Sequence, residues 1–275
     1  MIVQHNMTAL NANRQLGITN TNLARSTEKL SSGYRVNRAA DDAAGLSISE
    51  KMRGQIRGLE QASTNAEDGQ SLIQTAEGAL SEIHSVLQRM RELTVQASND
   101  TNVSADRKAI AKEVRALTSE INRIATQTQF NTMGLLSGGF KNKKLQVGAN
   151  TNQTISITIS SMTAGKLGVS ATVIAKVISS STGKEITKLI TTVNTAITKV
   201  STQRSALGAL QNRLDHTIAN ADNMAENLQS SESKIRDVDM ADEMVSYSAS
   251  SILQQAGQSM LAQANQSTQG VLSLL

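Results

Sequence analysis

Eight apolar residues in the second half of the chain recur at a spacing of seven. They are Ile186, Val193, Val200, Leu207, Leu214, Ala221, Leu228 and Ile235. This spacing keeps one side of an α-helix facing a partner helix along its whole length. The chain also contains no proline, the strongest helix breaker. The sequence therefore predicts one helix of about 50 residues, on the order of 75 Å long at roughly 1.5 Å per residue.

A second long helix is predicted from Ile48 to Ser98, because the same spacing returns there in two columns. The columns are Leu59, Ala66, Ile73, Leu80, Leu87, Thr94 and Ala62, Gly69, Ala76, Ile83, Met90, Ala97. A third column, Leu72, Ala79, Val86 and Leu93, widens the stripe, which is typical of a helix with more than one partner. A shorter helix follows, with Ser104 as its predicted N-cap and Asp106 in its first turn. Its apolar positions are Ile110, Val114, Leu117, Ile121 and Ile124.

Residues 137–183 differ in pattern from the helical segments on either side. "KKLQVGANTNQTISITIS" alternates apolar and polar residues at Leu145 and Val147 and again at Ile155, Ile157 and Ile159. A polar turn containing glycine and asparagine separates the two runs, so we predict a β-hairpin. The following "GVSATVIAKVISSSTGK" fits a strand and a helical turn equally well.

Both ends of the chain carry apolar residues at helical spacing. The N-terminal positions are Ile2, Ala9, Leu16, Leu23 and Leu30, and the C-terminal positions are Leu253, Ala256, Met260, Ala264 and Val271. "LSSGYRVNRAADDAAGLSIS" follows the first helix as a predicted connector. From Met244 to Leu275 there is no charged side chain, whereas a surface helix normally carries charge opposite its apolar stripe.

These patterns predict a mainly α fold, a long antiparallel helical bundle or coiled-coil rod with a small β-hairpin insertion and paired terminal helices. Aromatic residues make up only 1% of the chain, which leaves little bulk for a wide globular core. Folding the chain about the hairpin brings the two ends together. Two paired helices leave apolar faces uncovered, and covering them with further copies is favourable at roughly 25 cal/mol per Å². The sequence therefore predicts self-assembly.

The residue types that would support catalysis or cofactor binding are scattered. The three histidines, His5, His84 and His216, lie far apart in sequence, and no phosphate-binding glycine motif is present. The acidic run of Asp237, Asp239, Asp242 and Glu243 has the composition of a Mg²⁺ or Ca²⁺ site, but we favour a turn in which Asp239 or Asp242 caps the next helix. Asp41 and Asp42 are interpreted as connector residues rather than a catalytic pair. We expect no catalytic, cofactor or metal site.

Other partner classes are disfavoured by composition. The calculated pI is near 9.4, but no basic stripe with interleaved aromatics indicates nucleic-acid binding. No apolar run reaches the roughly 18 residues of a membrane span. The start of the chain does not resemble a general secretory signal, so these residues alone suggest a cytosolic protein.

Four stretches closely resemble the bacterial flagellins. They are "STEKLSSGYRVNRAADDAAGLSISEKMRGQIRGL" (26–59), "SLIQTAEGALSEIHSVLQRMRELTVQAS" (71–98), "QTQFN" (127–131) and "ILQQAGQSMLAQANQ" (252–266). The likeness covers residues 1–136 and 184–275. It implies an inner core domain of residues 1–45 with 237–275 and a helical rod domain of residues 46–236. Residues 137–183 of the rod domain then replace the variable outer domain.

The resemblance implies a structural subunit that polymerises into the flagellar filament, and it reverses the cytosolic expectation. It further implies export through the flagellum without a cleaved signal, aided by an export chaperone, with hook-associated and cap proteins as partners. Arg89, Leu93 and Glu113 match family positions that contact a Toll-like innate receptor. The alternatives are a hook–filament junction protein, another self-associating helical surface protein, and a metal-dependent enzyme built on the acidic run.

Overall fold

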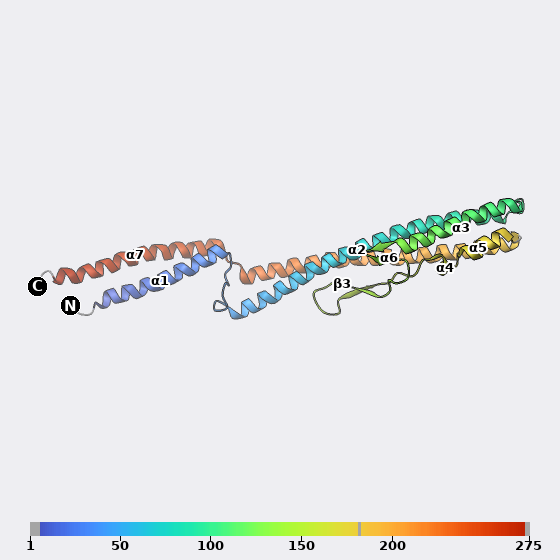
Figure 1. Cartoon of the computed structure of the whole chain (residues 1–275). Helices are drawn as coiled ribbons and strands as arrows, with labels where there is room; N and C mark the ends of the chain where they lie inside the picture. The colour runs from blue at the N-terminus through green and yellow to red at the C-terminus, as the bar shows by residue number, and fades with distance from the viewer. Residues whose placement is uncertain (1–5, 181–182, 273–275) are drawn as a thin grey trace. The chain divides into compact units, whose positions relative to one another are not determined.

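The computed structural model describes residues 6–180 and 183–272, leaving out the side chains of residues 172–173, 179–180, 183–184 and 267–272. Its helices are α1 (Met7–Ser32), α2 (Ala43–Ser98), α3 (Ser104–Gln127), α4 (Ala164–Leu167), α5 (Ala171–Ser180), α6 (Gly183–Arg236) and α7 (Met240–Leu272). Two short antiparallel pairs of strands lie between α3 and α4: β1 (Gln129–Phe130) with β2 (Met133–Gly134), and β3 (Lys143–Gln146) with β4 (Thr154–Ile157) (Figure 1).

The chain forms two compact units, residues 1–56 with 226–275 and residues 57–225. The two connectors between helices, residues 33–42 and 237–239, lie in the first unit. The predicted domain boundaries at residues 45 and 237 concern the assembled protein and stay a prediction.

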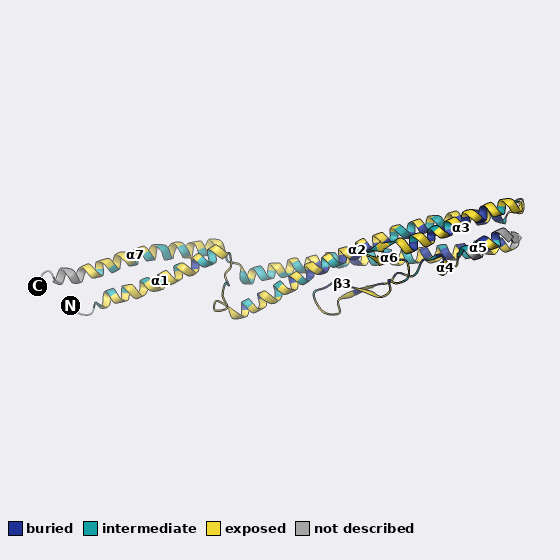
Figure 2. Ribbon diagram, in the orientation of Figure 1, coloured by how far each residue is buried: buried dark blue, intermediate teal, exposed yellow. Residues whose placement is uncertain are grey.

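The hydrophobic core belongs to the second unit, and Figure 2 shows buried residues along α2, α3, α5 and α6. Both predicted columns of α2 are buried, and so are Ile186, Val193, Val200, Leu207 and Leu214 of α6. These helices run antiparallel, since Glu77 pairs with Arg204 at 3.3 Å and Gln70 donates to Asp215 at 3.0 Å. The predicted mainly α fold with long heptad helices is confirmed.

Burial along α6 weakens toward its C-terminal end. The heptad positions are buried as far as Ala221, whereas Leu228 and Ile235 are only half-buried. A column of apolar residues at constant spacing is therefore not covered to a constant degree within the single chain.

The predicted hairpin is present as β3 and β4, with Leu145 opposite Ile155. Ile155, Ile157 and Ile159 are buried in the core of the second unit. The hairpin approaches α2 closely at two glycines, because Leu145 lies over Gly69 and a Cβ at Gly58 would be 2.9 Å from the Cβ of Ala149. The small side chains of α2 thus make room for the hairpin.

Two local features differ from the predictions, and the structure decides a third that the sequence left open. The N-cap of α3 is Val103 rather than Ser104, which is the first helical residue, and Asp106 accepts from the backbone N–H of Val103 at 3.3 Å. The ambiguous segment after residue 167 is helical, as α5, because its residues Ile174 and Ile178 point into the core. The β1–β2 pair was not predicted, since strands of two residues show no periodicity. None of the described helices is long and apolar enough to span a membrane.

Replacing Leu87, which is fully buried on α2, tests the heptad core. Leu87→Ala leaves a cavity and should lower the free energy of unfolding by about 2–5 kcal/mol. Urea unfolding followed by the helical circular dichroism signal measures the change. The matched control is Val95→Ala, an exposed apolar residue on the same helix, which should change stability by less than about 0.5 kcal/mol. Equal effects of the two substitutions would contradict this assignment of the core.

Candidate functional site

Helices α1 and α7 lie side by side as an antiparallel pair in the first unit (Figure 1). At one end Lys29 pairs with Glu243 at 3.5 Å, and at the other Asn6 donates to the backbone carbonyl of Ala264 at 2.9 Å. Between them Gly257 lets the helices approach, because a Cβ at that position would lie 3.3 Å from Cδ1 of Leu16. The two ends of the chain therefore pair through small residues and a few polar contacts.

This pair has almost no hydrophobic core among its described residues. The predicted positions Ala9, Leu16, Leu23 and Leu30 of α1 are half-buried, and only Ser26 of α1 is buried. On α7 the best covered described residues are half-buried, including Tyr247, Gln254, Gly257, Leu261 and Ala264. Figure 2 accordingly shows both helices largely exposed. Packing within one chain does not cover their apolar side chains.

The outward sides of the pair carry many large apolar side chains. Among the described residues, eleven of the fifteen exposed large hydrophobic side chains belong to the first unit. Nine of these lie on the two terminal helices: Met7, Leu10 and Ile18 on α1, and Met240, Met244, Val245, Ile252, Leu253 and Met260 on α7. We call these nine residues the outward apolar surface. A soluble protein rarely leaves so many large apolar side chains uncovered on two neighbouring helices.

Helix α7 is apolar on more than one side. Gln254 and Leu261 face α1, and Ile252 precedes Gln254 by two residues, which places it about 200° around the helix. Ile252 is 67% exposed, and Val245, seven residues earlier, is 70% exposed. Leu253 and Met260 lie on a flank between these two sides. Large apolar side chains on more than one side of a helix are normally covered, so α7 resembles a helix that packs on more partners than α1 alone.

The predicted C-terminal stripe divides between two environments. Ala264 is half-buried next to α1, whereas Leu253, Ala256 and Met260 are exposed. The reason is that α1 packs on the neighbouring side of α7, where Gly257 permits close approach. Ile2 lies outside the described residues, and so does the side chain of Val271.

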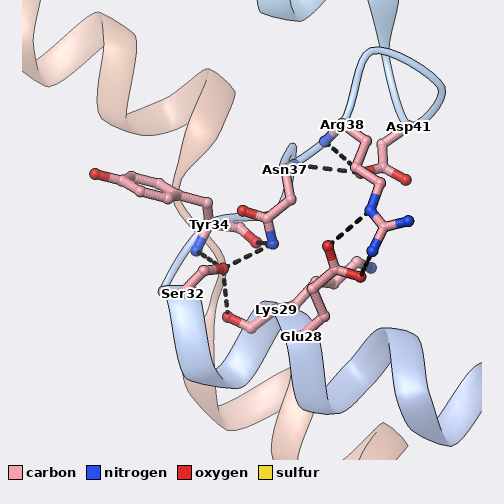
Figure 3. Close-up of polar contacts among 7 residues, drawn as sticks. All are labelled: Glu28, Lys29, Ser32, Tyr34, Asn37, Arg38 and Asp41. Atoms are coloured by element: carbon pink, nitrogen blue, oxygen red, sulfur yellow. Dashed lines mark hydrogen bonds and ion pairs between the residues drawn. The ribbon is translucent and has the colours of Figure 1, made fainter.

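The first connector, residues 33–42, is held by its own polar side chains (Figure 3). Arg38 makes two hydrogen bonds to Glu28, at 2.9 and 3.0 Å, and Asp41 accepts from the backbone N–H groups of Arg38 and Asn37 at 2.9 and 3.2 Å. Ser32 accepts from Asn37 at 2.7 Å. The backbone N–H of Arg38, followed by that of Asn37, lowers the pKa of Asp41. Asp41 is therefore a connector residue, as predicted.

The second connector, residues 237–239, is bonded to the first. Gly33 ends α1 in a left-handed conformation, at φ 75°, and its carbonyl accepts from Val238 at 3.0 Å. The backbone N–H of Arg35 donates to the carbonyl of Arg236 at 2.7 Å. The guanidinium of Arg236 lies 4.7 Å from the ring centroid of Tyr34 and pairs with Glu50 at 2.8 Å. The hydrogen bond from Arg236 lowers the pKa of Glu50. Backbone and side-chain contacts together fix where α1 ends and α7 begins.

The acidic run around this connector has structural partners. Asp239 accepts from the backbone N–H groups of Ala241 and Asp242 at 2.9 and 3.4 Å, which confirms the predicted cap of α7. Asp237 accepts from the hydroxyl of Ser233 at 2.6 Å. Within residues 6–180 and 183–272, no group of three acidic or histidine side chains is arranged to hold a metal ion.

The predicted receptor residues fall into two groups. Arg89 on α2 is exposed and pairs with Glu92 at 3.0 Å and with Glu113 of α3 at 2.9 Å. The hydrogen bond to Glu92, followed by that to Glu113, raises the pKa of Arg89. Leu93 is only 2% exposed and is part of the core, because α3 folds back beside α2 and covers it. Leu93 is therefore not a surface contact in this structure, contrary to the prediction.

Acidification should loosen the first connector. Its two backbone hydrogen bonds hold the pKa of Asp41 below the usual range, so their stabilising effect is complete above the ordinary aspartate pKa and is lost as pH falls through the lowered value. Amide exchange at Asn37 and Arg38 should accelerate over that range. The effect should stay local, because Asp41 is exposed. Asp41→Asn should reproduce the faster exchange at neutral pH, and a carboxyl that titrates at the ordinary aspartate pKa would contradict this account.

Comparisons with known proteins find similar sequences along most of the chain. Residues 3–141 match the family described as the bacterial flagellin N-terminal helical region, and residues 190–275 match the bacterial flagellin C-terminal helical region. A flagellin of Halalkalibacterium halodurans is 53% identical over 275 residues, covering all of both chains. The crystal structure of Bacillus cereus flagellin aligns with a TM-score of 0.50 at 30% identity, over 60% of this chain and 94% of that one.

A likeness in fold, with little sequence identity, extends to a Vibrio parahaemolyticus protein described as a flagellar hook-associated protein. It aligns with a TM-score of 0.63 over 72% of this chain and 100% of that chain, but at only 12% identity. At that identity the match shows a shared fold and nothing more.

Proposed function

Because this chain belongs to the bacterial flagellin family, we propose that its outward apolar surface forms contacts between subunits. The protein is a structural subunit that polymerises into the flagellar filament used for swimming, and it is not an enzyme. The observation that carries the proposal is the exposure of the nine apolar side chains on α1 and α7. Copies of the same chain supply the cover that α1 alone does not give α7.

The energetics of covering this surface are favourable. Full burial of a side chain such as Ile252 or Val245 contributes about 1.5–3 kcal/mol. No charged side chain follows Glu243, so copies that pack on α7 beyond this residue bury no charged side chain of the helix. Glu243 itself already pairs with Lys29. The outward side of α7 thus gains from association without the main penalty that opposes it.

A hook–filament junction protein is the nearest alternative, and the comparisons do not favour it. The flagellin match extends over both ends and, at 53% identity, over the whole chain. The likeness to a hook-associated protein is one of fold at 12% identity.

For the arrangement within the filament, we propose an inner core domain of residues 1–45 with 237–275. The uncovered faces of α1 and α7 support it, since the most enclosed place in a filament is its centre. Residues 46–236 then form the rod domain around it, with residues 137–183 nearest the outside. The elements of this segment are β3, β4 and the short helices α4 and α5, and in this proposal they replace a larger outer domain.

The export route and the assembly partners are also proposals. As a filament component the protein acts outside the cell. We propose that it travels through the flagellum itself without a cleaved signal, and that a chaperone covers its outward apolar surface until then. Hook-associated and cap proteins would meet the subunits at the ends of the filament. The resemblance to flagellins and the aggregation risk of an uncovered α7 support these partners.

A Toll-like innate receptor is a further proposed partner, with Arg89 and Glu113 as its contacts. Both side chains are exposed and joined by an ion pair between α2 and α3. Leu93 supports the backbone beneath them from the core. A receptor that binds this surface would compete with subunit packing, so it would recognise monomers.

A charge on the outward side of α7 should block polymerisation. Ile252→Asp leaves the monomer folded, because Ile252 is exposed there, but it buries an unpaired carboxylate in the filament. We expect the critical concentration for seeded polymerisation, measured by sedimentation, to rise by at least about tenfold. The matched control Ile252→Leu keeps the apolar side chain and should polymerise normally. Normal filaments of Ile252→Asp in electron micrographs would refute the proposed contact.

Removing the Arg89 side chain tests the receptor contact. Arg89→Ala should weaken binding of monomer to the receptor ectodomain by about tenfold, as expected for an arginine at the centre of an interface. Arg123→Ala is the matched control, because Arg123 is also exposed and makes an ion pair with a glutamate on its own helix, Glu120. Surface plasmon resonance measures both. Equal affinities of wild type and Arg89→Ala would remove Arg89 from the proposed site.

A further inference from the structure

Four of the nine side chains in the outward apolar surface are methionines. Met7 is 68% exposed and Met260 is 61% exposed, and Met240 and Met244 are exposed to about half. Met90 and Met162 are instead buried in the core of the second unit. The thioether sulfur is the most readily oxidised group available here, since the chain contains no cysteine. Oxidant therefore reaches methionines on the outward surface before those of the core.

We propose that Met7, Met240, Met244 and Met260 are sites of reversible oxidation that control polymerisation. The inference rests on the proposed subunit contacts of α1 and α7. The oxidant is a peroxide: its O–O bond breaks, one oxygen atom joins the thioether sulfur to give methionine sulfoxide, and the peroxide is reduced to water or an alcohol. Methionine sulfoxide reductases return the sulfur to the thioether: two thiols are oxidised to a disulfide, and the oxygen leaves as water.

The effect of the added oxygen differs between free and assembled subunits. In the free subunit these side chains face water, which hydrates the sulfoxide, so oxidation leaves the monomer's fold unchanged. Packing against another copy removes that water. The other residues of the outward surface, such as Val245, Ile252 and Leu253, have no side-chain donor to offer the sulfoxide. The backbone N–H groups within a helix are already bonded. Burial of the sulfoxide then costs free energy, as for any unpaired polar group.

The same geometry makes the response depend on the state of assembly. Sulfurs covered by neighbouring copies are shielded from peroxide, whereas those of free subunits are open. Oxidation would therefore stop the addition of new subunits while sparing filament already formed. Methionine suits this position, because its flexible side chain packs as well as leucine while it is reduced.

The experiment compares oxidised and reduced monomer in seeded polymerisation. Wild-type monomer is treated with hydrogen peroxide, and peptide mass spectrometry measures sulfoxide at each methionine. We expect oxidation of the four outward methionines well before Met90 and Met162. We also expect the critical concentration to rise about tenfold or more, by the cost of burying unpaired polar groups. Treatment with both reductase types, one for each sulfoxide epimer, should restore polymerisation.

The matched variant replaces all four methionines with leucine, a substitution that nearly conserves volume. It retains Met133 and Met224, which are exposed in the second unit. We expect it to polymerise after peroxide treatment as it does before. Inhibition that persists in the leucine variant would assign the effect to other methionines and overturn the proposal. Should the leucine variant not polymerise at all, the reductase treatment of wild type decides instead.

Two outcomes separate this inference from the proposed subunit contacts. If fully oxidised wild type polymerises like reduced protein while Ile252→Asp does not, the oxidation proposal fails and the contacts stand. If Ile252→Asp also polymerises normally, the contacts themselves are wrong. Equal rates of oxidation of the four methionines in filament and in monomer would likewise overturn the proposal, because they would then lie uncovered in both states.

Discussion

The structure depends on a seam of apolar side chains at heptad spacing along α2 and α6. Helices α3 and α5 and the β3–β4 hairpin pack against this seam. The large hydrophobic cluster that results lies within residues 66–214. With only 1% aromatic residues, the chain cannot build a wide core, so it builds a narrow one over many turns. A narrow core accommodates few layers of helix. The terminal helices lie outside it, and their apolar side chains are left for other contacts.

Polar contacts replace apolar packing near the C-terminal end of α6, where the heptad positions are less buried. Beyond Ala221 the heptad positions of α6 are only half-buried, and the first unit relies instead on Arg236, which pairs with Glu50 and lies over Tyr34. One backbone hydrogen bond then joins the two connectors, and another joins the first connector to the last residue of α6. Individually such exposed contacts contribute little. Together they fix where α1 ends and where α7 begins, and they leave the outward sides of both helices uncovered.

Periodicity predicted the fold well wherever one helix side meets one partner. The columns of α2, and that of α6 as far as Ala221, are buried as expected, and Asp239 caps α7. Periodicity did not predict the packing where a helix has apolar residues on more than one side or meets more than one partner. On α7, large apolar residues occur on more than one side, so spacing alone could not tell that Gly257 and Leu261, rather than Leu253 and Met260, face α1. Leu93 belongs to a third apolar column of α2, and only the return of α3 beside it decides that it is buried. The pairing of Arg89 with Glu113 likewise needs the fold.

The absence of charge from α7 follows from the same constraint. Its last charged residue, Glu243, lies opposite Lys29 of α1, and the ion pair uses that charge within the chain. Farther along, α1 offers few basic partners, and each copy that packs on α7 would have to bury any charge placed there. Glutamine, serine and asparagine keep the free subunit soluble and can still hydrogen-bond when covered. A sequence that must be tolerable in water and buried in a polymer is thus restricted to apolar and neutral polar residues, as this one is from Met244 onward.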